Sequence, residues 1–203
     1  MSNRRITRRR VLKRAAAAAE TPCVITSAAL GNGETPPASE RVVLGHIGVG
    51  NRGRSLLRGF LNCKGAQCVA AADAYKSRRD AAAAMMKGKA YADFRELVDR
   101  DDIDAVVVAT QDHWHVPMAM AAAKAGKDAY VEKPLGISIE QNLLCRELFR
   151  EKERIFQYGT QQRSSRHCRF GCELVRSGRV GKIERIEVIA PNGGAGGATD
   201  EIP

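Results

Sequence analysis

The feature that most constrains the fold is a short apolar segment that ends in a glycine-rich turn. Residues 41–47 (RVVLGHI) have the Val and Ile content typical of a β-strand, and the sequence GVGNRG follows at 48–53. A helical pattern begins directly afterwards, with its apolar residues on one side: Leu56, Leu57, Phe60 and Leu61. The chain is therefore expected to pass from a strand through a tight turn into a helix.

Each glycine of this turn has a separate physical reason. Gly48 lets the chain turn tightly, Gly50 lets the backbone approach a pyrophosphate, and Gly53 lets the helix pack close to the strand. Phosphates placed there would meet free N–H groups and the positive end of the helix dipole. A purely structural turn is the alternative, but the flanking strand and helix favour a dinucleotide site.

The net charge of the 203 residues is +10, which raises nucleic-acid binding as an alternative function. Seven basic residues and no acids lie within the first fourteen positions, which leaves 26 basic and 23 acidic residues for the rest of the chain. The excess charge therefore belongs to a leader, and the 5% of aromatic residues offers few stacking surfaces for bases. We expect no nucleic-acid partner.

The leader resembles a twin-arginine export signal. Residues 7–13 (TRRRVLK) follow the pattern Ser/Thr-Arg-Arg-x-Phe-Leu-Lys with Val11 in place of Phe, and small residues near Ala28 offer a cleavage site. We expect a signal peptide over 1–30, a linker over 31–40, and a periplasmic or otherwise exported protein that contacts the twin-arginine machinery. No stretch approaches the roughly 18 to 20 apolar residues of a membrane anchor. A basic amphipathic arm is the alternative.

Short apolar strands alternate with helices from residue 41 onward. Strands are expected at 41–47, 67–72, 104–110, 127–132 and 154–158, with a short strand end near Tyr91. This alternation predicts an α/β fold with a doubly wound parallel sheet, a Rossmann domain over 41–160. The run at 104–110 is continuously apolar, as in a central strand that is covered on both faces, and Pro117 is expected to open the next helix.

The remaining residues, 161–203, are interpreted as the incomplete start of an α/β carboxyl-terminal domain. A helix is expected from about 165 to 177 and a strand from 182 to 190. Because a single strand without a partner makes no stable sheet, this second domain begins but is not completed.

Asp73 follows the second strand, 25 positions after Gly48. The dinucleotide fingerprint places a carboxylate near that position on the adenosine ribose, where it repels a 2′-phosphate and favours NAD over NADP. Two alternatives stay open. Asp73 could cap the following helix, and the nearby cations Lys76, Arg78 and Arg79 could accept NADP.

Three further motifs follow strand ends: TQDHWH at 110–115, EKP at 132–134 and GTQQRS at 159–164. With GVGNRG they occur in the order found in the Gfo/Idh/MocA oxidoreductases, which this chain resembles over nearly all of residues 41–189. The resemblance implies an amino-terminal Rossmann domain that carries NAD or NADP. It also implies a carboxyl-terminal domain that covers a sugar or polyol substrate and joins subunits into a homo-oligomer.

The resemblance assigns Lys133 as the catalytic residue, and it gives roles along the cofactor. The cofactor-binding residues that it implies are Gly48, Gly50, Asn51, Arg52, Gly53, Asp73, Thr110, Asp112, His115, Glu132, Lys133 and Gln161. The glycine turn would hold the pyrophosphate, Glu132 would lie near the nicotinamide ribose, and Gln161 near the nicotinamide. Chemistry supports the lysine independently, because removing hydride from an alcohol requires a group that accepts the hydroxyl proton. A salt-bridged surface lysine is the alternative.

The cysteines and histidines do not predict a metal site. Cys168 and Cys172 lie one helical turn apart beside His167, but no second pair completes a tetrahedral zinc site, and His113 and His115 do not share one side of a helix. We interpret the six cysteines as small buried hydrophobes.

We therefore expect the amino-terminal portion of an NAD(P)-dependent oxidoreductase that transfers a hydride between the nicotinamide and a sugar or polyol hydroxyl. The family resemblance also implies a histidine, often four residues after an aspartate, on a helix of the second domain, and this pattern does not occur after Lys133. An NAD-dependent glycosidase and a non-catalytic dinucleotide-binding remnant are the alternatives.

Overall fold

The computed structural model describes residues 27–32 and 35–189, in two compact parts, Met1–Arg41 and Val42–Pro203. The expected export motif at residues 7–13 lies outside the described residues. In the first part, a short helix α2 (Ser27–Leu30) and a 3₁₀ turn η1 (Ala38–Glu40) are present, and the Arg41 Nε donates a hydrogen bond to the Pro36 carbonyl. Within the described ranges, no helix is long and apolar enough to cross a membrane.

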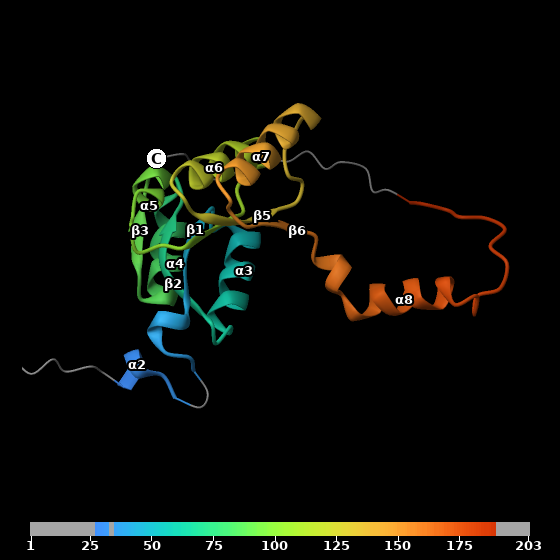
Figure 1. Ribbon diagram of the computed structural model, residues 1–203, viewed down its shortest axis with the longest axis horizontal. Helices are drawn as coiled ribbons and strands as arrows, with labels where there is room; N and C mark the ends of the chain where they lie inside the picture. Colours follow the sequence, from blue (N-terminus) through green and yellow to red (C-terminus); the bar gives the residue numbers. More distant parts are fainter. Residues whose placement is uncertain (1–26, 33–34, 190–203) are drawn as a thin grey trace, which may run out of the picture. The chain divides into compact units, whose positions relative to one another are not determined.

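The second part contains a six-stranded parallel sheet in the order β3-β2-β1-β4-β5-β6 (Figure 1). Its strands are β1 (Val42–Ile47), β2 (Ala66–Ala72), β3 (Lys89–Tyr91), β4 (Ala105–Val108), β5 (Asp128–Glu132) and β6 (Phe156–Gly159). From β1, the chain adds β2 and β3 on one side, and it then returns to add β4, β5 and β6 on the other side. The expected doubly wound Rossmann sheet is therefore confirmed, and its order reverses between β1 and β4.

Helices connect the strands and cover the sheet: α3 (Asn51–Leu61), α4 (Lys76–Met86), α5 (Phe94–Val98), α6 (Asp112–Lys124) and α7 (Ile139–Glu151). Two apolar clusters hold these layers together. One joins the sheet to α5, α6 and α7 around Leu97, Val106 and Phe149, and the other joins it to α3 and α4 around Leu57 and Ala82. The continuous apolar run of β4 reflects contact with helices on both faces.

Two expectations about local structure are wrong. Pro117 lies inside α6, which already begins at Asp112 after the N-cap residue Gln111. A proline near a helix start removes only one hydrogen bond, here to the carbonyl of residue 113, so the polar residues before it still form the first turn. Residues 182–189, the described portion of the expected seventh strand, form no strand, because a strand requires a neighbour for its backbone hydrogen bonds. The helix before them, α8 (Arg166–Arg176), is present.

Cys23 lies outside the described residues, and the cysteines within them divide into two groups. Cys68 and Cys145 are buried as expected, and burial raises the pKa of each thiol to about 11. Cys63, Cys168 and Cys172 are exposed, so their interpretation as buried hydrophobes is wrong. Those in α8 are exposed because no residue of that helix is buried.

His46 is fully buried in β1 next to a thiol. Its Nε2 lies 3.3 Å from the Sγ of Cys68, and its ring packs edge-on against Phe60. Burial lowers the pKa of His46 to about 4, so this histidine is a neutral core residue.

Among the glycines of the described residues, Gly53 has the least room for a side chain. An added Cβ there would lie 1.9 Å from the Gly48 carbonyl oxygen, and backbone cannot move away as a flexible side chain can. We expect Gly53→Ala to lower the free energy of unfolding by about 3 kcal/mol, the upper end of typical overpacking costs. Urea denaturation followed by circular dichroism measures this loss.

Gly59→Ala provides a matched control on the same helix, since no atom lies within 4 Å of its added Cβ. Alanine is a better helix former than glycine, so the free energy of unfolding of this variant is expected to rise by up to about 1 kcal/mol. Equal losses in both variants would contradict the close approach of α3 to the turn.

Candidate functional site

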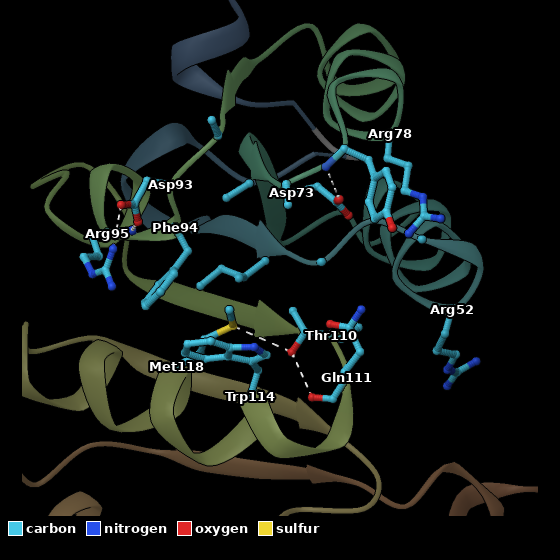
Figure 2. A pocket seen from close by; sticks show the side chains of 18 of the residues that line it. Arg52, Asp73, Arg78, Asp93, Phe94, Arg95, Thr110, Gln111, Trp114 and Met118 are labelled. Atoms are coloured by element: carbon cyan, nitrogen blue, oxygen red, sulfur yellow. Dashed lines mark hydrogen bonds and ion pairs between the residues drawn. The ribbon is translucent and has the colours of Figure 1, made fainter. Parts of the chain in front are cut away.

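A cleft of about 740 Å³ opens at the carboxyl ends of β1, β2 and β4, where the strand order reverses (Figure 2). The glycine turn forms one end of the cleft, and Asp73 lies in the middle of it. Open α/β sheets bind ligands at such a switch point, because the connections diverge there and leave a crevice. Sequence reasoning expected the site at this edge.

The turn presents unpaired backbone donors to this cleft. Gly48 has a φ of +79°, which a glycine adopts without strain, and the first hydrogen bond of α3 runs from the Arg54 N–H to the Gly50 carbonyl. The N–H groups of residues 51–53 therefore have no acceptor within the helix. An added Cβ on Gly50 would meet only an Arg78 side-chain nitrogen at 3.7 Å, so the backbone there is open to a ligand. This cradle fits a pyrophosphate.

Asp73 is held by the backbone on two sides. Its Oδ2 accepts a hydrogen bond of 2.9 Å from the Val49 N–H, and its Oδ1 accepts one of 2.9 Å from the Tyr75 N–H. The N-cap residue of α4 is Tyr75, and it makes no side-chain capping bond, so Asp73 is not the cap of this helix. Each carboxylate oxygen keeps a second lone pair, so the fixed group can still accept ribose hydroxyls.

Flat side chains line the cleft around Asp73. Sequence reasoning named Arg78 as a possible NADP contact and included Trp114 in a strand-end motif, but it missed Tyr75 and Phe94. The Arg78 guanidinium lies over the Tyr75 ring, 4.0 Å from its centre, while Phe94 and Trp114 line other sides of the same cleft. Figure 2 shows Trp114 on α6 and Arg78 on α4 extending from different elements. These planar groups can stack on a purine ring. Their positions just after strand ends were the available signal.

A second group of expected site residues meets at Glu132, whose side chain is only 4% exposed. Its Oε1 accepts a 2.5 Å bond from the Arg52 Nε and another from the Gln161 Nε2, and its Oε2 accepts a 2.9 Å bond from the Lys133 N–H. The Gln161 Nε2 also donates to the Tyr130 hydroxyl at 3.0 Å. The structure thus joins the glycine turn, the EKP motif and the GTQQ motif through one carboxylate.

The other expected site residues lie in different environments. Thr110 lines the cleft, whereas Asp112 is exposed at the start of α6 and does not line it. His115 is 1% exposed, with its Nδ1 2.6 Å from the Pro134 carbonyl and its Nε2 3.2 Å from the Thr110 carbonyl. It therefore connects two strand ends beneath the site and does not line the cleft.

Lys133 lies on the surface, in front of a cis peptide bond to Pro134. Its ammonium makes no hydrogen bond or ion pair with a described residue, so the salt-bridge alternative has no support there. Over residues 27–32 and 35–189, no group of three or more His, Cys, Asp or Glu side chains is placed to hold a metal ion.

Comparison with known proteins gives one family match. The family described as "Oxidoreductase family, NAD-binding Rossmann fold" (GFO_IDH_MocA) matches residues 42–160. Among curated proteins, the chain is 36% identical over 115 residues to "Glycosyl hydrolase family 109 protein 1" of Shewanella sp. (strain ANA-3). That match covers 52% of this chain and 25% of the relative.

Solved structures with the same fold include inositol dehydrogenases. Myo-inositol 2-dehydrogenase from Lactobacillus plantarum superposes with a TM-score of 0.66 at 25% identity, over 70% of this chain and 43% of that one. Scyllo-inositol dehydrogenase from Lactobacillus casei, solved with NAD(H) and scyllo-inositol, gives 0.64 at 26% identity, over 70% and 42%. The chain thus spans about a quarter of the matched curated relative and less than half of these structures.

His115 provides a test of how the strand ends are joined. His115→Phe removes both ring nitrogens from buried carbonyl groups, and we expect the free energy of unfolding to fall by about 1 to 3 kcal/mol. His113→Phe, on an exposed position of the same helix, should change it by no more than about 0.5 kcal/mol. Chemical denaturation of both variants measures the difference, and similar losses would show that the buried contacts of His115 contribute nothing.

Proposed function

This chain belongs to the Gfo/Idh/MocA oxidoreductase family, and on that premise we propose that its cleft binds NAD. We further propose that the full-length protein transfers a hydride between this cofactor and a sugar or polyol hydroxyl. The observation that carries the proposal is Asp73, whose carboxylate is fixed by the Val49 N–H beside the unpaired donors of α3. That arrangement fits a ribose next to a pyrophosphate.

Each part of the site has a chemical task in this proposal. The N–H groups of residues 51–53 bind the pyrophosphate, Asp73 accepts the ribose hydroxyls, and Arg78 with Tyr75 stacks on the adenine. The nicotinamide supplies the hydride acceptor when it is bound. Lys133, as the neutral amine, takes the proton of the substrate hydroxyl and becomes an ammonium. The side chain is free for this role, since it is exposed and has no hydrogen-bond or ion-pair partner among the described residues.

NAD is preferred over NADP in this proposal because a fixed carboxylate repels a 2′-phosphate. Asp73→Asn removes this charge and should lower the ratio of NAD⁺ affinity to NADP⁺ affinity about fivefold. That factor corresponds to the ~1 kcal/mol of repulsion between two like charges 4 Å apart in water. Isothermal titration with both dinucleotides measures the ratio. Asp80→Asn is the control, because Asp80 pairs with Lys76 away from the cleft. If the ratio of NAD⁺ to NADP⁺ affinity were unchanged in Asp73→Asn, the carboxylate of Asp73 would not be the cause of a preference for NAD.

The catalytic role of Lys133 requires the full-length protein. Myo-inositol and scyllo-inositol are the first probes, because two structural neighbours are dehydrogenases of these polyols. Lys133→Met should lower kcat by about 100-fold or more, the usual contribution of a general acid or base, while NAD⁺ still binds. Nicotinamide absorbance measures turnover, and Lys124→Met, at an exposed position of α6, should leave it unchanged. Equal turnover in wild type and Lys133→Met would exclude this lysine as the base.

A glycosidase that uses NAD transiently is the second candidate, because the curated relative carries the name of a glycosyl hydrolase. Such an enzyme oxidises its sugar, eliminates the glycosidic substituent, adds water in its place and reduces the sugar again with the same NADH. It would release the chromophore of an aryl glycoside with no net change in nicotinamide absorbance. Net NADH formation with a free polyol instead supports the dehydrogenase, and NAD⁺ binding without either reaction supports a non-catalytic dinucleotide-binding protein.

We also propose that the protein is exported through the twin-arginine route and assembles as a homo-oligomer. The motif at 7–13 supports export, and family membership supports assembly. Mass spectrometry of protein from its host tests both, since it reports removal of residues 1 to about 30 and the native subunit number. A cytoplasmic protein that keeps its leader would contradict the export proposal.

A further inference from the structure

Arg52 occupies the junction of two sites. It lies in the first turn of α3 and lines the dinucleotide cleft, with 45% of its side chain exposed. Its Nε is 2.5 Å from the Oε1 of Glu132, which is 80 positions away in sequence and at the end of β5. The residue that family resemblance gives to the pyrophosphate is therefore also the cation paired with a buried carboxylate.

Glu132 needs that cation. A carboxylate in a site that is 4% exposed has lost most of its hydration, and removing its partner leaves a buried charge without compensation. The same oxygen accepts from the Gln161 amide, and the other oxygen accepts from the Lys133 N–H. The position of Glu132 therefore determines where the GTQQ turn and the backbone before Pro134 lie.

The surrounding backbone leaves Glu132 little freedom to move. Gly159 of β6 pairs with Glu132, and an added Cβ on Gly159 would lie 3.0 Å from the Glu132 Cα and 3.1 Å from the Tyr130 hydroxyl. That hydroxyl accepts the second bond of the Gln161 amide. The amide is thus fixed from two sides, by a strand-borne carboxylate and a strand-borne phenol.

We propose that Arg52 and Glu132 form a positioning pair that couples the phosphate cradle of α3 to the residues around the nicotinamide half of the dinucleotide. The inference rests on the proposed function, since it requires a dinucleotide in the cleft. Glu132 in this role is a positioning residue, because its buried carboxylate accepts bonds from Arg52, Gln161 and Lys133 and so determines where these groups lie. Because Arg52 contacts both regions, a pyrophosphate bound in the cradle of α3 would affect the position of Glu132, and with it the position of Gln161 and Lys133.

The test compares two ligands that share the adenine half of the site. NAD⁺ spans both halves, whereas ADP ends at the cradle. Glu132→Gln is expected to lower NAD⁺ affinity about tenfold, because the misplaced Gln161 and Lys133 no longer fit the nicotinamide half, and to leave ADP affinity within about twofold. Isothermal titration of the 203-residue protein measures both affinities, and Asp102→Asn, which breaks a surface pair with Arg100, should change neither.

A double-mutant cycle tests the coupling itself. Because Arg52 also lines the cradle that both ligands occupy, the cycle follows the ratio of NAD⁺ affinity to ADP affinity. Arg52→Met should lower this ratio, and adding it to Glu132→Gln should lower the ratio little further, because the pair is already broken. Arg52 is half-exposed, so its variant also serves if Glu132→Gln does not fold.

The remaining outcomes overturn the inference. An unchanged NAD⁺ affinity in Glu132→Gln, an equal loss for both ligands, or losses from the two substitutions that simply multiply would each exclude a positioning pair. If the wild-type protein binds both ADP and NAD⁺ and the variants give one of these three results, the inference is wrong but the proposed function stands. A wild-type protein that binds neither ligand overturns the proposed function together with the inference.

Discussion

The structure depends on one close approach of backbone to backbone, between the turn after β1 and the first turn of α3. The Gly48 carbonyl oxygen occupies the space where any side chain at position 53 would begin. This contact sets the direction in which α3 leaves the sheet, and so directs the unpaired N–H groups of its first turn toward the cleft. The Asp73 carboxylate then fixes the turn from β2 through the Val49 N–H.

Two different physical solutions hold the two halves of the candidate site. Around the adenine half, planar side chains and a backbone-bound carboxylate form an open cleft that a ligand can enter. Around the other half, polar side chains from α3, β5 and the turn after β6 bond to one another through the buried Glu132. The adenine half therefore offers exposed surfaces to a ligand, whereas the other half is held in place by hydrogen bonds between its own side chains.

The exposed apolar residues after β6 agree with the partial length of the chain relative to its structural neighbours. Phe170 and Val175 on α8, and Ile186, Val188 and Ile189 beyond it, remain more than 45% exposed. In the Rossmann sheet, residues of the same types are buried because helices cover both faces. These side chains have the composition of a core, but within residues 35–189 no second layer packs against them.

The sequence by itself determined the order of strands and helices, the glycine turn and the polar strand ends, because periodicity and glycine spacing are local properties of the chain. The cap of α5 is equally local, since the Asp93 side chain accepts from the Arg95 N–H only two residues along. Tertiary structure decided the rest. That His115 lies beneath the site, that Arg52 pairs with Glu132, and that the expected seventh strand does not form are set by contacts between distant segments, which no local pattern records.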